Sequence, residues 1–193
     1  MRWTKAALAR LAAEVREKEL QANPYQRICP YDLADLYGVA VYTLQDLAES
    51  GCPLEAIEFF TSVRPEAWSA ALVPNGTGQF IVENNAHTPQ RRRSNIAHEM
   101  AHLLLEHEFD RILFTNGKRG CANPASKEME AQAAELSGEL LLPGASARRA
   151  AAYGQSDDQV AEQFDVSTEF ARWRMNVTGA RRIADRAARK RSR

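Results

Sequence analysis

The chain has 193 residues, with 25 basic and 25 acidic side chains and a hydrophobic fraction of 45%. This length suffices for one domain with its own core, and the balanced charge predicts no general affinity for nucleic acid or an anionic membrane. No apolar stretch approaches membrane-spanning length, and no apolar leader follows Met1. The 3 cysteines form no CxxC pair and leave an odd number, which favours a reducing compartment. We therefore expect a cytoplasmic protein with no membrane partner.

The first third of the chain is expected to combine short helices with one strand. Apolar residues at helical spacing predict a helix over 3–22, and a second helix is expected over 31–37. Residues 39–43 are β-branched and aromatic, which is typical of a strand. Residues 53–63 are expected to be helical again.

A β-hairpin is expected next. Residues 68–73 and 79–83 flank the sequence Pro-Asn-Gly-Thr-Gly, whose residues are typical of a tight turn. Together with the strand at 39–43, the hairpin predicts a small sheet.

The rest of the chain is expected to be helical. Two longer helices are predicted over 88–107 and 123–142, because each begins with a polar residue followed by proline. Residues 145–190 are expected to form three short helices, with breaks at Gly154, Asp165 and Gly179. A small sheet that precedes a helical half predicts an α+β fold.

The stretch His98-Glu99-Met100-Ala101-His102 matches the pattern HExxH. On a helix, two histidines four residues apart project from one face and can hold one metal ion. Catalytic zinc takes three protein ligands, for which two histidines and a glutamate are an established set, and it keeps a position for water. Glu99 lies beside the first ligand, where it can act as a general base on that water.

The third ligand is expected on the later helix. Glu128, Glu130 and Glu135 all lie there, and helical periodicity alone does not choose among them.

Other polar residues near the motif have two interpretations each. Arg93 is a candidate for binding a substrate carbonyl, and a structural ion pair explains it equally well. His87 is a candidate oxyanion donor or an exposed loop histidine. His107 lies five residues beyond His102, so on a continuous helix it is expected to point elsewhere.

The strand at 79–84 is a candidate substrate-binding element. If it forms the sheet edge beside the HExxH helix, an extended substrate can pair with the backbone of Phe80, Ile81 and Val82. The alternative is a plain structural strand.

Two stretches resemble motifs of a known family. Residues 93–107 (RSNIAHEMAHLLLEH) resemble the core of the ImmA/IrrE metallopeptidases, and residues 130–143 (EAQAAELSGELLLP) resemble their second motif, E-x-x-A-N-x-F-A-x-x-L-L-M-P. The resemblance runs from about residue 25 to 177. It implies a mainly helical, zincin-like fold of the gluzincin type, with a small three-stranded sheet beside the HExxH helix and one zinc ion per chain.

The resemblance also selects residues. Aligned on Pro143, the glutamate ligand of the family falls on Glu130. The asparagine of the family is replaced by Ala134 and its phenylalanine by Leu136. Loss of the asparagine removes an expected hydrogen bond that would orient a ligand.

Three segments follow from these patterns. They are an N-terminal helix at 1–24, a zinc metallopeptidase core at 25–144 and a C-terminal helical segment at 145–193. The last segment contains a helix-turn-helix-like stretch, and its final thirteen residues hold seven basic side chains. Only Arg172 and Arg174 offer positive charge on its second helix, so packing within the peptidase is favoured over DNA binding through 156–193.

The function that the sequence indicates is a zinc-dependent endopeptidase. In this interpretation His98, His102 and Glu130 bind zinc, and Glu99 is the catalytic base. The resemblance implies a protein substrate such as a transcriptional repressor or an antitoxin-like transcription factor. The alternatives are a DNA- or protein-binding regulator with a non-catalytic zinc site, and a toxin-like partner in a two-component stress module.

Overall fold

The computed structural model describes residues 3–107 and 124–191, with backbone alone for 124–126 and 191. Cys121 and the expected helix start at Asn123 lie outside this part of the chain. Among the described residues, no helix combines the length and apolarity that a membrane crossing requires.

The first half of the chain mixes short helices and strands, as predicted. Its elements are α1 (Lys5–Glu14), the π-helical turn η1 (Val15–Glu19), α2 (Pro30–Leu36), β1 (Ala40–Thr43), α3 (Leu44–Glu49), α4 (Leu54–Glu58), the π-helical turn η2 (Phe59–Val63), the 3-10 turn η3 (Pro65–Ala67), β2 (Ala70–Asn75) and β3 (Gly78–Glu83). Helix α3 was not predicted. A capping box formed by Thr43 and Asp46 begins this helix, and that pair was present in the sequence as a signal.

The second half is helical. Its elements are α5 (Pro89–Leu104), α6 (Pro124–Leu141), α7 (Gly144–Ala152), α8 (Asp157–Phe164), α9 (Thr168–Val177) and α10 (Ala180–Arg191). The predicted breaks are confirmed, because Gly154, Asp165 and Gly179 all have positive φ angles. The prediction of three helices after residue 145 is wrong, since three breaks separate four helices in this part of the chain. The predicted α+β fold, mainly helical with a small sheet, is confirmed.

The strand order corrects one prediction about the sheet. Within the described residues the sheet has three strands in the order β1-β3-β2. β3 pairs in parallel with β1 and antiparallel with β2. The expectation that 79–84 forms the edge is therefore wrong, because both sides of β3 are occupied and the edge strands of this sheet are β1 and β2. β3 is the last of the three strands in the sequence, and it was therefore expected at the edge of the sheet. The connection through α3 and α4 instead leaves β1 paired with the side of β3 that faces away from β2.

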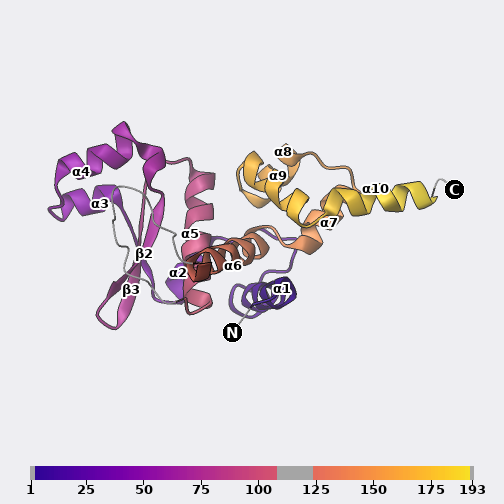
Figure 1. Ribbon diagram of the computed structural model, residues 1–193, viewed down its shortest axis with the longest axis horizontal. Helices are drawn as coiled ribbons and strands as arrows, with labels where there is room; N and C mark the ends of the chain where they lie inside the picture. The colour runs from indigo at the N-terminus through magenta and orange to yellow at the C-terminus, as the bar shows by residue number, and fades with distance from the viewer. Residues whose placement is uncertain (1–2, 108–123, 192–193) are drawn as a thin grey trace.

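Helix α5 is the central element of the molecule. It packs against β2 and β3 on one side and against α6 on the other. Figure 1 shows the sheet with α3 and α4 on one side of α5 and the C-terminal helices on the other. The core contains Ile96 and Met100 of α5 with Leu136 and Leu140 of α6, each 0% exposed. Burial of side chains of this size contributes about 1.5–3 kcal/mol each.

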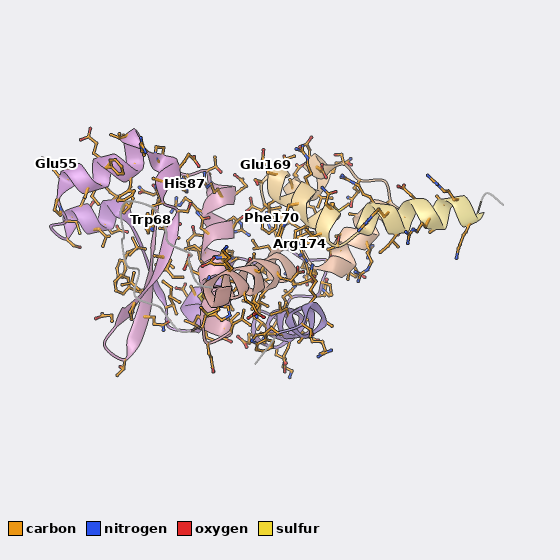
Figure 2. The ribbon with its side chains drawn as sticks, viewed as in Figure 1. Glu55, Trp68, His87, Glu169, Phe170 and Arg174 are labelled. Atoms are coloured by element: carbon orange, nitrogen blue, oxygen red, sulfur yellow. The ribbon has the colours of Figure 1, made fainter. Side chains whose placement is uncertain are left out.

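A buried ion cluster joins α9 to α6. The Arg174 side chain is 0% exposed, and its guanidinium lies 3.1 Å from Glu135 Oε1 and 2.6 Å from Glu139 Oε1. Its Nε also donates to the carbonyl of Leu142, at 3.2 Å. Figure 2 shows Arg174 on the side of the C-terminal helices. Because this charge is enclosed, one of the two arginines considered for DNA contact is not available on the surface.

Gly138 makes room for that arginine. A Cβ atom at this position would lie 2.9 Å from both Cδ and Nη1 of Arg174. In an ordinary helix interior, glycine to alanine stabilises by about 0.5–1 kcal/mol. Here we expect Gly138→Ala to lower the free energy of unfolding by about 1–3 kcal/mol, because the buried guanidinium is held by Glu135 and Glu139 and would have to shift.

Urea denaturation followed by circular dichroism measures this change. Ala134→Gly, on the same helix, is the control for helix propensity, and we expect it to destabilise as well. If propensity alone governed both positions, the two substitutions would have opposite signs. A stabilising Gly138→Ala would contradict the packing described above.

Candidate metal centre

Local sequence fixes where α5 begins. The Thr88 hydroxyl accepts a hydrogen bond from the backbone N–H of Arg91, at 3.4 Å, and Pro89 occupies the first turn. One face of the helix is buried, including Ala97 and Ala101. The 3.6-residue period then places His98 and His102 together on a face that is less enclosed.

A buried carboxylate fixes α5 against the sheet. Glu83, at the end of β3, is 1% exposed. Arg92 of α5 donates to its two oxygens, at 3.2 and 2.5 Å, and the hydroxyl of Tyr31 donates at 2.9 Å. Paired in this way, the charge of Glu83 links β3, α2 and the start of α5.

The structure brings the three expected ligands together. His98 Nε2 lies 3.2 Å from His102 Nε2 and 3.0 Å from Glu130 Oε2. His102 Nε2 lies 3.6 Å from Glu130 Oε1. One donor atom from each residue lies within 4.8 Å of the others, in a group that could hold a metal ion.

The spacing of these atoms fits a tetrahedral ion. Zinc–nitrogen bonds of about 2.0–2.1 Å at tetrahedral angles place two ligand nitrogens about 3.3 Å apart. The observed separation of the two imidazole nitrogens is 3.2 Å. Two imidazoles and one carboxylate are also a donor set that zinc uses in catalytic sites, so the residues fit the ion in both chemistry and geometry.

Electrostatics keeps the third donor ionised. The two imidazoles that face it, His102 and His98, hold the pKa of Glu130 far below its usual range. Metal ligands must be deprotonated, so this carboxylate is in the form that binds a cation.

The other two candidate glutamates on α6 have different partners. Glu135 pairs with Arg174 and with Lys5, at 3.1 Å in each case. Glu128 accepts a hydrogen bond from Gln132, at 3.3 Å. Neither belongs to the group of converging donors, which agrees with the choice of Glu130 by motif alignment.

Glu99 lies at the edge of the sheet. Its Oε2 accepts a hydrogen bond from the backbone N–H of Leu72, at 3.0 Å. Leu72 belongs to β2, an edge strand of the sheet, and its N–H points away from β3 because it bonds to Glu99. The carboxylate is therefore next to both the histidine pair and the free edge of β2.

The four expected substrate contacts are not supported by the structure. Ile81 is 0% exposed and Val82 6%, and both lie on the central strand. Phe80 packs edge-on against Tyr42 of β1, with ring centroids 5.6 Å apart. Arg93 forms the structural ion pair that was its alternative, because its Nε lies 3.2 Å from Asp165 Oδ2 and its Nη2 donates to the carbonyl of Ile28.

Two other histidines also differ from expectation. His87 is buried rather than exposed, and its Nε2 donates to the carbonyl of Pro65, at 2.9 Å. Figure 2 shows it on the sheet side of α5. His107 does not point away from the motif, because its Nδ1 lies 3.0 Å from Nδ1 of His102. Burial, the largest effect, lowers the pKa of His107, which favours a neutral ring.

A helix that presents two histidines and a neighbouring carboxylate beside the edge strand of a small sheet is typical of zincin-like metallopeptidases. The family model described as the IrrE N-terminal-like domain, Peptidase M78, matches residues 59–176. The chain belongs to this peptidase family, as the resemblance predicted. No curated protein matches the chain.

The choice of Glu130 as ligand can be tested directly. We expect Glu130→Ala to lower zinc affinity by at least about 100-fold, because it removes one of the three ligands and the only carboxylate among them. Glu128→Ala is the matched control on the same helix, and we expect a change of at most a few-fold. Competition with a chromophoric chelator measures both. Equal losses in the two variants, or a larger loss at Glu128, would show that the ligand is assigned wrongly.

Proposed function

We propose that this protein is a zinc-dependent endopeptidase in which His98, His102 and Glu130 bind the metal and Glu99 is the catalytic base. The observation that carries the proposal is the convergence of three ligand atoms beside a carboxylate at a free strand edge. A bound zinc ion supplies a Lewis acid that polarises a peptide carbonyl and lowers the pKa of water.

Glu99 is suited to move the proton. It follows His98 directly, so its carboxylate is near the water that attacks the peptide. As a general base it takes a proton from this water, and it then donates that proton to the amine that leaves. Its hydrogen bond with Leu72 holds the carboxylate at the strand edge, where the scissile peptide would lie.

The free edge of β2 is where we place the substrate. β3 has no unpaired side, whereas β2 pairs only with β3 in the described sheet. Main-chain hydrogen bonds to an extended peptide give affinity without demanding a particular sequence. The outward N–H of Leu72 is adjacent to the catalytic base, so a peptide bound along this edge would lie next to the three ligands.

The substrate class is inferred from the resemblance to the ImmA/IrrE peptidases. We propose a cytoplasmic regulatory protein, such as a transcriptional repressor or an antitoxin-like factor. An extended segment of such a protein would supply the strand that pairs with β2.

The alternative, a regulator with a non-catalytic zinc site, has less support. A structural zinc site closes all four positions with protein ligands. Among the described histidine, cysteine and acidic side chains, the converging group contains His98, His102 and Glu130, which leaves a position for water. On the helix-turn-helix-like segment, Arg174 is buried and Arg172 pairs with Asp157, at 3.2 Å.

Substitution of the base tests the proposal. We expect Glu99→Gln to bind zinc with wild-type stoichiometry and to lose peptide cleavage by about 100- to 10,000-fold, because the amide cannot accept a proton. Each zinc-loaded protein is incubated with a peptide library derived from a proteome, and mass spectrometry then identifies the cleaved peptides. The library covers many sequences at once, so cleavage is detected whichever peptide is the substrate.

Co-expression with candidate repressors extends this experiment to folded substrates. If the wild-type protein binds zinc but cuts neither peptides nor repressors, the peptidase proposal is wrong. Equal cleavage by wild type and Glu99→Gln would instead remove Glu99 from the mechanism.

A further inference from the structure

We propose that His107 and Gln132 are positioning residues, which fix the tautomer and orientation of His102 so that its Nε2 faces the metal. This inference rests on the metal site of the proposed function. Neither residue is a metal ligand. A series of hydrogen bonds joins them to His102, and the donor and acceptor groups of these side chains determine the direction of each bond.

The way α5 ends brings His107 to this place. The N–H of His107 bonds to the carbonyl of His102, at 3.1 Å, and the N–H of Glu106 to that of Leu103, at 3.0 Å. This pair of bonds is the Schellman motif, which reverses the chain at a helix end. Glu106 occupies its left-handed position, with φ of 51°. His107 therefore turns back beside His102 instead of continuing around the helix.

The direction of these hydrogen bonds follows from the contact farthest from the metal ligands, between Gln132 and Glu128. The amide Nε2 of Gln132 donates to Oε1 of the Glu128 side chain, at 3.3 Å. The remaining amide oxygen of Gln132 faces His107 Nε2, at 3.2 Å. An amide oxygen only accepts, and therefore Nε2 of His107 carries the proton.

The hydrogen bonds continue from His107 to the metal ligand His102. A neutral imidazole protonated at Nε2 has a lone pair at Nδ1. Nδ1 of His107 lies 3.0 Å from Nδ1 of His102, so His102 must donate there. Nε2 of His102 then holds a lone pair, and it is this atom that lies 3.2 Å from His98 Nε2. Histidine ligands in metal sites are commonly oriented in this way through the other ring nitrogen.

Packing alone is the competing explanation. The rings of His102 and His107 also meet edge to face, with centroids 5.0 Å apart. A ring without an acceptor would preserve this contact and lose the hydrogen bond. An asparagine would lose much of the contact but could place an oxygen near the position of Nδ1. These two substitutions at His107 therefore separate the explanations.

The experiment compares zinc affinity, by chelator competition, in wild type, His107→Phe and His107→Asn. We expect His107→Phe to weaken zinc binding by about 10- to 100-fold, and His107→Asn to recover most of that loss. Gln132→Met removes the acceptor for His107 without touching a ligand, and we expect a loss of several-fold. This variant also keeps the test open if His107→Phe does not fold.

A spectroscopic measurement reports the tautomers themselves. In ¹⁵N NMR spectra of the zinc-loaded protein, we expect His102 to be protonated at Nδ1 and His107 at Nε2. Protonation of His107 at Nδ1 would overturn the inference. Wild-type zinc affinity in both His107→Phe and Gln132→Met would also overturn it, and would leave the proposed function intact if Glu130→Ala still loses zinc. If wild type binds zinc no better than Glu130→Ala, the metal site fails, and the inference with it.

Discussion

The contact between α5 and α6 positions every donor of the candidate metal centre. Small buried side chains lie on both helices, Ala97 and Ala101 on α5 and Ala133 on α6. The distance between packed helices depends on the side chains at their contact, so small residues permit a close approach. At the observed spacing Glu130 Oε2 lies 3.0 Å from His98 Nε2. A larger side chain in the contact would therefore separate the ligands without changing any of them.

The C-terminal helices stabilise that contact from outside. Arg174 of α9 holds two carboxylates of α6, and Gly138 leaves the space that its guanidinium fills. Breaking a buried pair by removal of one partner costs about 3–5 kcal/mol, because the other charge stays buried. The segment that resembles a helix-turn-helix in sequence thus supports the helix that carries Glu130. The family match, which extends to residue 176, agrees with this structural role.

Much of the fold could be predicted from local signals. Thr88 and Pro89 marked the start of α5, and the breaks after α7, α8 and α9 fell where expected. The order of the strands could not be predicted, because hydrophobic patterning does not show which strand is central. This error put the expected sheet edge at β3, where Ile81 and Val82 are buried.

In the candidate site, too, some residues could be predicted from local sequence and others could not. Helical periodicity alone predicted the i, i+4 histidine pair, and alignment with the second motif of the family predicted Glu130. His107 was predicted to point away from His102, which is wrong. The chain reverses after α5 with Glu106 in a left-handed conformation, and no residue in the sequence signalled this because glycine is the residue that usually marks such a position. Arg174 looked like a surface residue of a DNA-reading helix. Its burial depends on Glu135 and Glu139 of α6, and such long-range pairs leave no mark in local sequence.

The central claim is that three side chains from two helices hold one zinc ion and leave a position for water. Anomalous diffraction at the zinc edge, from crystals of the zinc-loaded protein, tests it most directly. We expect one peak, bonded to Nε2 of His98, Nε2 of His102 and a carboxylate oxygen of Glu130, with a water molecule as the remaining ligand. A peak at other residues, or a fourth protein ligand that closes the site, would contradict it.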